Sequence, residues 1–321
     1  MKTRSIVSMF ALVALMAFAV LSLTAQAPYK APRTPDGVPD LQGIYLTTSG
    51  TPLERPQNLG AKEFYTAAEM PEVLKANAAR AAAGDERDPG VHYDNDQFGL
   101  TSTASGQVPF NRTSLVVGPT GRIPATLAAA TERARGLAAD RALHQWDGPE
   151  NRGIAERCIY WGFEGPPMTP GGYNGNVQIV QGPGYVALMQ EMIHDVRIIP
   201  TDNRKHIDPS VKQWFGDSVG HWEGDTLVVD TTNFNDRPPL GRNTGEQLHV
   251  VERFTRTATD TIMYNFTVSD PTVWETSWSA EFPLGRMKGP IYEYACQEGN
   301  YGMMNILSGA RAAEKEAAAK K

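Results

Sequence analysis

Short runs of alternating apolar and polar residues dominate the chain after Tyr173, and this alternation is typical of half-buried β-strands. The clearest runs are 261–268 and 274–282, where every second side chain would point to the same face of a strand. Further strands are predicted at 176–181, 185–192, 195–202, 220–232 with a turn at 223–225, 248–256 and 290–297.

The connections between most of these strands are too short to hold a helix, so consecutive strands should pair antiparallel in a meander. A long meander with one apolar face hides that face by closing on itself or by folding into two layers. We therefore predict a mainly β fold: an antiparallel meander closed as a barrel-like body of calycin type, with a sandwich as the alternative.

The first half of the chain has a different pattern. Residues 27–60 are rich in Pro and Gly, which predicts an extended arm laid over the folded body. A capping box at Thr66 and Glu69 begins an Ala-rich helix that ends near Gly84, and a second Ala-rich helix is predicted at 124–142. Between these helices, residues 84–114 form a long polar excursion, either a lid or a surface loop.

These patterns divide the chain into four parts. They are a signal peptide (1–27), an extended arm with a helical and loop region packed on the body (28–172), the antiparallel β body (173–308) and a solvated C-terminal tail (309–321).

The first part predicts export. Two basic residues precede an apolar run from Ile6 to Leu23, which ends in small residues up to Ala27, as in a cleaved secretory signal peptide. An uncleaved membrane anchor is the alternative, because the run approaches the length of a span. Later segments contain no comparable run, so we expect no membrane span in the mature chain. In an exported protein, Cys158 and Cys296 are expected to form one disulfide; two buried thiols are the alternative.

Charge excludes one class of partner. The formal net charge is -6, and no cluster of Lys and Arg stands in the body of the chain. A nucleic-acid binder needs such a basic surface, so we expect a small-molecule ligand or substrate and no nucleic acid.

Residues 216–220 spell G-x-S-x-G, the pattern around the nucleophilic serine of many hydrolases. A nucleophile elbow requires a helix directly after Ser218, whereas the residues after Gly220 read as a hairpin. We interpret the motif as a turn before a strand.

Glu191, His194 and Arg197 lie within seven residues in an otherwise apolar pair of strands. On one strand Glu191 and Arg197 would share a face, and a turn at His194 would let the histidine join them. The functional hypothesis assigns all three to acid–base catalysis at the barrel mouth. The alternative is a structural ion pair beside a turn histidine.

Five other residues on strands or beside turns are candidates for contacts with a ligand, although the aromatic ones are equally well explained as core. They are His221, His249, Arg253, Tyr264 and Trp278. The six histidines of the chain show no metal-binding spacing, so we predict no metal and no cofactor.

Several segments resemble an uncharacterised family of exported bacterial proteins. They are 34–45, 51–64, 114–124, 191–200, 216–234, 248–256 and 291–311. The resemblance implies a bacterial periplasmic or secreted location and treats the chain as one unit. It implies no activity.

Two main functional hypotheses follow. The first is a cofactor-independent hydrolase, lyase or isomerase acting on a small organic molecule in a barrel cavity, where His194 or Glu191 moves a proton and Arg197 stabilises an anion. The second is a non-catalytic small-molecule binding protein. A third is an interaction module that uses the Pro-rich arm. The grouping of polar residues on one pair of strands favours the enzyme.

Overall fold

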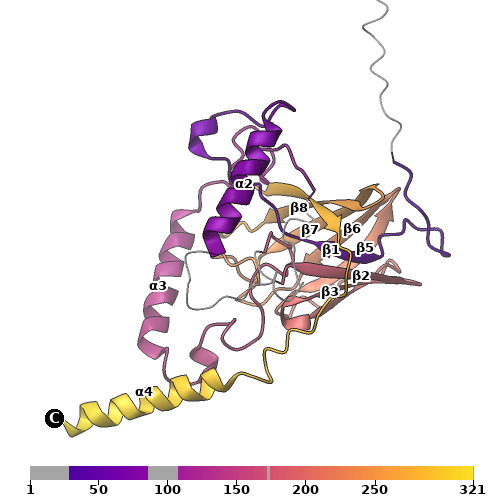
Figure 1. The fold of residues 1–321 in the computed structure, drawn as a ribbon. Coiled ribbons are helices and arrows are strands. Elements are labelled where there is room, and N and C mark those ends of the chain that lie inside the picture. The colour runs from indigo at the N-terminus through magenta and orange to yellow at the C-terminus, as the bar shows by residue number, and fades with distance from the viewer. Residues whose placement is uncertain (1–28, 86–107, 172–173, 321) are drawn as a thin grey trace, which may run out of the picture. The chain divides into compact units, whose positions relative to one another are not determined.

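Nine antiparallel strands organise the fold. The computed structural model describes residues 29–85, 108–171 and 174–320 (Figure 1). Its strands are β1 (Gly43–Leu46), β2 (Asn176–Gly182), β3 (Tyr185–Gln190), β4 (Val196–Pro200), β5 (Asp217–Glu223), β6 (Thr226–Thr232), β7 (His249–Ala258), β8 (Thr261–Ser269) and β9 (Trp278–Arg286). They form one sheet in the order β4-β3-β2-β1-β9-β8-β7-β6-β5. The predicted mainly β, antiparallel, barrel-like fold is confirmed.

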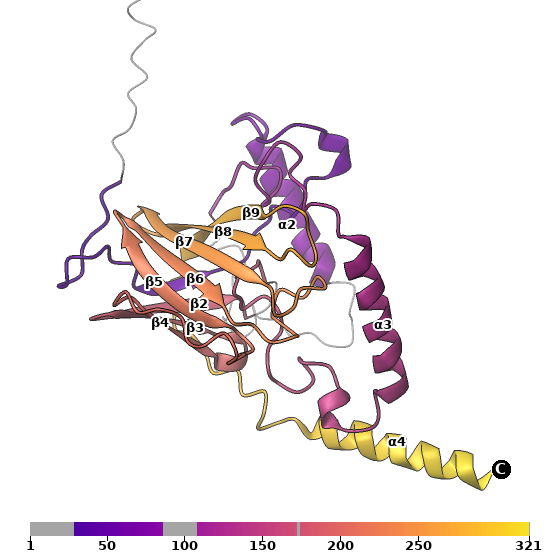
Figure 2. The same ribbon diagram turned by 180° about the vertical axis from the view of Figure 1, so that it is seen from behind.

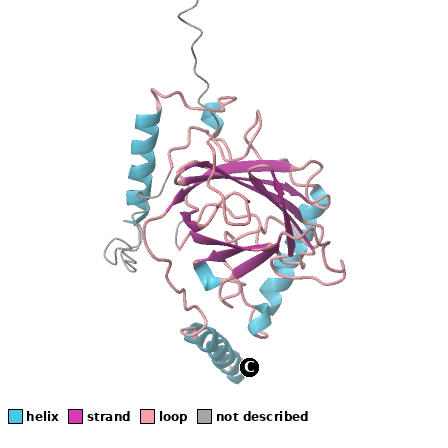
Figure 3. Ribbon diagram, turned by 90° about the vertical axis from the view of Figure 1, so that its right-hand side faces the viewer, coloured by secondary structure: helices cyan, strands magenta, loops and turns pink. Residues whose placement is uncertain are grey.

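The sheet curls into a nearly closed barrel, and Figure 3 shows its ring of strands. The end strands β4 and β5 meet through side chains rather than through a backbone ladder. A Cβ atom on Gly220 of β5 would lie only 2.9 Å from Cγ2 of Ile199 on β4. Glycine therefore lets the two end strands approach closely, and the second glycine of G-x-S-x-G has a structural role.

The strand that joins the two halves of the barrel comes from the Pro- and Gly-rich arm. β1 pairs with β2 through Tyr45 and Val177 and with β9 through Tyr45 and Arg286. The sequence predicted this arm as extended but did not predict the strand. Conversely, the strand predicted at 290–297 is wrong, because that segment joins no sheet.

Alternating side chains fill the barrel. Phe254, Tyr264 and Phe282 are fully buried, with ring centroids 4.9 Å apart for Phe254 and Tyr264 and 5.3 Å apart for Tyr264 and Phe282. The loop 162–170 reaches this core: the backbone N–H of Met168, itself fully buried, donates to the Tyr264 hydroxyl at 2.8 Å. Figure 3 shows a loop inside the ring of strands. Core side chains and this loop thus occupy the interior.

Three α-helices are described: α2 (Met70–Asp85), α3 (Ala128–His144) and α4 (Tyr301–Ala319); the short 3-10 turns are η1 (Gln57–Leu59), η2 (Pro149–Asn151) and η3 (Met192–His194). Ahead of α2, the Glu69 carboxylate accepts hydrogen bonds from the N–H and hydroxyl of Thr66, both 2.8 Å. The Leu127 N–H donates to the Val273 carbonyl at 2.8 Å and holds the start of α3. Both helices lie on the same side of the barrel (Figures 1 and 2).

A disulfide joins Cys158 to Cys296 across 138 residues of sequence, as predicted. It ties the C-terminal segment to the loop that precedes Tyr160. No helix in the described part of the chain is both long and apolar enough to cross a membrane. The predicted signal peptide, and most of the excursion 84–114 with His92, lie outside the described residues.

Candidate functional site

The three residues predicted as catalytic lie close together in the chain: Glu191 and His194 in the turn between β3 and β4, and Arg197 on β4. The buried Glu191 carboxylate accepts a hydrogen bond from the Asn176 amide, and the backbone N–H of Tyr292 lies 3.4 Å from it. The exposed His194 donates from Nδ1 to the Tyr294 carbonyl at 3.0 Å. Arg197 instead turns into the barrel. The structure therefore gives the three side chains separate partners.

Inside the barrel, Arg197 forms a two-pronged ion pair with Glu252 of β7, whose side chain is fully buried. The second prong, Nη2 to Oε1, measures 2.9 Å, and the Tyr264 hydroxyl donates to the same Oε1 at 2.7 Å. Burial raises the pKa of Tyr264 well above its ordinary value, so the phenol stays protonated. This cluster is balanced in charge, and both carboxylate oxygens of Glu252 accept hydrogen bonds, as a buried ion pair requires.

A small cavity of about 10 Å³ adjoins this cluster, between Glu164, Gln190, Asp195, Arg197 and Phe215. Its volume suits about one water molecule. Burial raises the pKa of both Glu164 and Asp195 above their ordinary values. These carboxyls resemble tuned acid–base groups, but an organic substrate does not fit between them.

The predicted ligand contacts fall into two groups. Tyr264 and Trp278 are buried in the core. His221 and Arg253 face outward, where both contact Glu223; the distance from His221 Nε2 to the Glu223 carboxylate is 3.1 Å.

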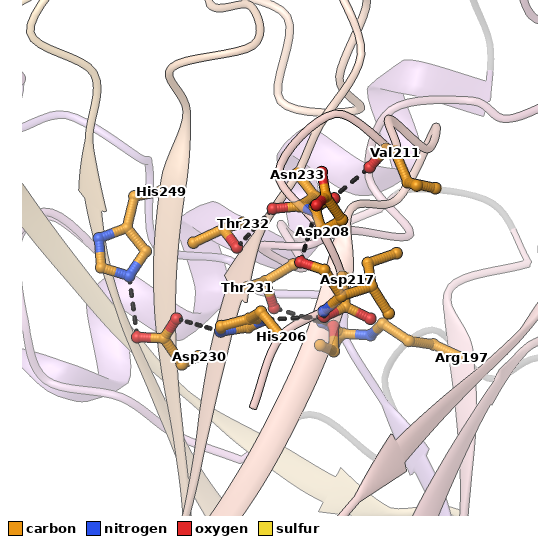
Figure 4. A network of polar contacts seen from close by, with 12 residues as sticks. Arg197, His206, Asp208, Val211, Asp217, Asp230, Thr231, Thr232, Asn233 and His249 are labelled. Atoms are coloured by element: carbon orange, nitrogen blue, oxygen red, sulfur yellow. Dashed lines mark hydrogen bonds and ion pairs between the residues drawn. The ribbon is translucent and has the colours of Figure 1, made fainter. Parts of the chain in front are cut away.

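His249 belongs to a chain of polar contacts on the outer face of β5, β6 and β7 (Figure 4). Its Nε2 lies 2.8 Å from one Asp230 oxygen, and the other Asp230 oxygen lies 2.9 Å from Nε2 of His206. Nδ1 of His206 then contacts Asp217 at 2.8 Å. The hydrogen bond that His249 donates to the Asp230 carboxylate raises the pKa of His249. Within the described ranges, no three His, Cys, Asp or Glu side chains are arranged to hold a metal ion.

A cleft of ligand size lies outside the barrel. It measures about 740 Å³ and is enclosed by α3, the loop 151–154 and the connection 236–247 between β6 and β7. Aliphatic groups of Leu137, Ile154 and Pro238 contribute to its walls. Its volume falls in the range of small-molecule sites, about 300–1,000 Å³.

Cations outnumber anions in this cleft, although the whole chain has a net charge of -6. Its five arginines are Arg133, Arg141, Arg152, Arg237 and Arg242, against the carboxylates Asp140, Asp236 and Glu246. Glu246 is partly neutralised by Lys212 at 3.6 Å, and Asp140 lies 3.9 Å from His144.

The buried Tyr160 also lines the cleft, and its hydroxyl donates to the Arg237 backbone carbonyl at 2.7 Å. Burial raises the pKa of Tyr160 to about 12, while the charges of Arg237 and Arg141 act in the opposite direction. Among the described residues, Arg141, Arg237 and Arg242 have no side-chain hydrogen bond or ion pair, so their donors are open to an anion.

The backbone that presents Arg242 is unusual. Gly241, Arg242 and Asn243 all have positive φ, at 62°, 51° and 67°. A non-glycine residue in this region costs roughly 1–2 kcal/mol, and such residues cluster at functional sites. The turn is closed by the Thr244 N–H, which donates to the Gly241 carbonyl at 2.8 Å.

Sequence reasoning missed this cleft because its residues are far apart in the chain and form no motif. One signal was present: the connection 233–248 is long for neighbouring antiparallel strands and contains two arginines among Pro and Gly. Comparison of the chain with protein-family models and with curated proteins found no match.

Proposed function

We propose that this protein binds a small organic anion in the cleft between α3 and the connection 236–247. One observation carries the proposal: Arg141, Arg237 and Arg242 line a cavity of about 740 Å³, and none of them forms an ion pair with another described residue. Guanidinium groups bind carboxylates through paired, charge-assisted hydrogen bonds. The aliphatic groups in its walls offer nonpolar contacts to the body of such a ligand.

Calorimetric titration at constant ionic strength tests this proposal. The panel is benzoate, phenylpropionate, citrate and glucuronate. Losing one charge-assisted hydrogen bond costs about 1.5–3 kcal/mol, so Arg141→Gln and Arg242→Gln should each raise the Kd about tenfold or more. Arg135→Gln is the matched control, because Arg135 lies on α3 but does not line the cleft. No binding across the panel, or an equal loss in the control, would refute the proposal.

Acid–base catalysis at the barrel mouth is a second candidate. The cavity between Glu164 and Asp195, whose pKa values are raised by burial, has room for about one water molecule, which these carboxyls would activate for attack on a substrate bound outside the cavity. This candidate retains the hydrolase, lyase or isomerase hypothesis with a different proton carrier. Chromogenic esters are suitable first substrates. Asp195→Asn should abolish turnover without changing anion binding in the cleft, and unchanged turnover would exclude this role.

Export to the periplasm or the cell exterior is also part of the proposal. The disulfide between Cys158 and Cys296 supports it, since disulfides persist in oxidising compartments. N-terminal sequencing of protein recovered from the periplasm and medium of an expressing bacterium tests it. A mature N-terminus near Ala27 is expected, and an intact Met1 would contradict cleavage.

A further inference from the structure

Arg242 borders a second cavity as well as the cleft. This second cavity measures about 410 Å³. Leu240 lines the second cavity, Gly241 lines the cleft, and Arg242 lines both. The two spaces are therefore neighbours, with the positive-φ turn at 241–243 on their shared border.

The walls of the two spaces differ in chemistry. Apart from Arg242, none of the described residues that line the second cavity has an ionisable side chain. It combines the aliphatic groups of Leu53, Leu115 and Leu240 with the hydroxyls of Ser49, Thr51 and Thr169. A ligand part that fits here carries no charge, has apolar faces and exchanges hydrogen bonds with hydroxyls, which both donate and accept.

The hydroxyls of Thr51 and Thr169 are available for such a ligand. Ser49 Oγ accepts a hydrogen bond from the Thr51 backbone N–H at 3.1 Å, but neither threonine hydroxyl has a hydrogen-bond partner among the described residues. Both threonines are half-buried. Two unpaired hydroxyls beside leucine side chains match a sugar ring, which has polar edges and C–H faces.

We infer that the cleft and the second cavity form one bipartite site for an acidic sugar chain. A uronic acid places its carboxylate at the arginines of the cleft, and an adjoining neutral sugar lies over Thr51 and Thr169. Arg242, on the shared border, contacts both parts. This inference rests on the proposed anion binding and adds the class of ligand.

Calorimetry with three probes tests the inference: glucuronate, phenyl glucuronide, and a disaccharide of glucuronate linked to xylose. The disaccharide should bind at least tenfold more tightly than glucuronate. The affinity of phenyl glucuronide should exceed that of glucuronate by a smaller factor. The double variant Thr51→Val/Thr169→Val keeps side-chain shape but removes both hydroxyls. This double variant should bind the disaccharide no more tightly than glucuronate, while its affinity for glucuronate stays at the wild-type value. Thr257→Val, on the exposed end of β7, is the control.

The outcomes distinguish failure of the bipartite site from failure of the proposed anion binding in the cleft. Equal affinity for glucuronate and the disaccharide would overturn the bipartite site while anion binding stands. A gain for phenyl glucuronide as large as that for the disaccharide, unaffected by the double variant, would overturn the sugar assignment. Binding of benzoate or citrate without glucuronate would do the same. Failure of every carboxylate would refute both the inference and the proposed function.

Discussion

Replacing Glu252 by Gln tests whether the polar cluster inside the barrel is structural. The Glu252 side chain is fully buried, and that of its partner Arg197 is 10% exposed. Glu252→Gln preserves shape and an acceptor for Tyr264, but leaves a buried guanidinium without its counter-charge. Breaking a buried ion pair costs about 3–5 kcal/mol, so we expect the free energy of unfolding to fall by about 3 kcal/mol or more.

Replacing the unpaired Arg197 as well should recover much of the free energy of unfolding that Glu252→Gln loses. The double variant Arg197→Met/Glu252→Gln has a neutral interior, in which the Gln carbonyl still accepts from the Tyr264 hydroxyl. Replacing a buried ion pair by neutral groups is often tolerated, so the double variant should be more stable than Glu252→Gln alone. Glu223→Gln is the control: its ion pair with Arg253 is exposed and should contribute at most about 1 kcal/mol.

Urea denaturation at pH 7, followed by the fluorescence of the six tryptophans, measures these differences. A cost below about 1 kcal/mol for Glu252→Gln would mean that water solvates Arg197. A double variant less stable than the single one would refute the counter-charge argument. Either result would reopen the barrel interior as a site for substrate.

Three further predictions concern stability. In the variant Cys158→Ser/Cys296→Ser the free energy of unfolding should fall by about 2–5 kcal/mol, because the disulfide closes a loop of 138 residues. In urea denaturation, a reducing agent should destabilise the wild type by the same amount and leave the variant unchanged. The raised pKa of His249 means that its contact with Asp230 stabilises the fold fully below about pH 6.5 and less as pH rises through the folded pKa; His249→Gln should therefore destabilise more at pH 5.5 than at pH 8.5, and the reverse would contradict this pairing. Gly220→Ala should lower the melting temperature through overpacking at the β4–β5 closure, and an unchanged value would place these strands further apart.

Local patterns predicted most of the barrel because each strand from β2 to β9 has one buried face. The two failures have a common physical cause. The alternation of apolar and polar residues at 290–297 is typical of a strand. This segment has no free edge to pair with on the preceding strand, because β9 already pairs with β8 on one side and with β1 on the other. β1 itself has little alternation and is specified by long-range pairing that a local pattern does not encode.

The candidate site was less predictable than the fold. The expectation that a charged residue in an apolar strand needs a partner is met at Arg197, but its partner Glu252 lies 55 residues away and fills the interior of the barrel. Proximity in sequence suggested a cluster with Glu191 and His194, whereas tertiary packing gives those side chains other partners. The arginines of the cleft come from α3 and a loop, so only the fold brings them together.

The most direct test of the central claim is a crystal structure of the protein soaked with glucuronate. Ligand binding in the cleft predicts density for the carboxylate within hydrogen-bond distance of Arg141, Arg237 or Arg242. Density inside the barrel beside Arg197 and Glu252, with the cleft empty, would contradict the claim.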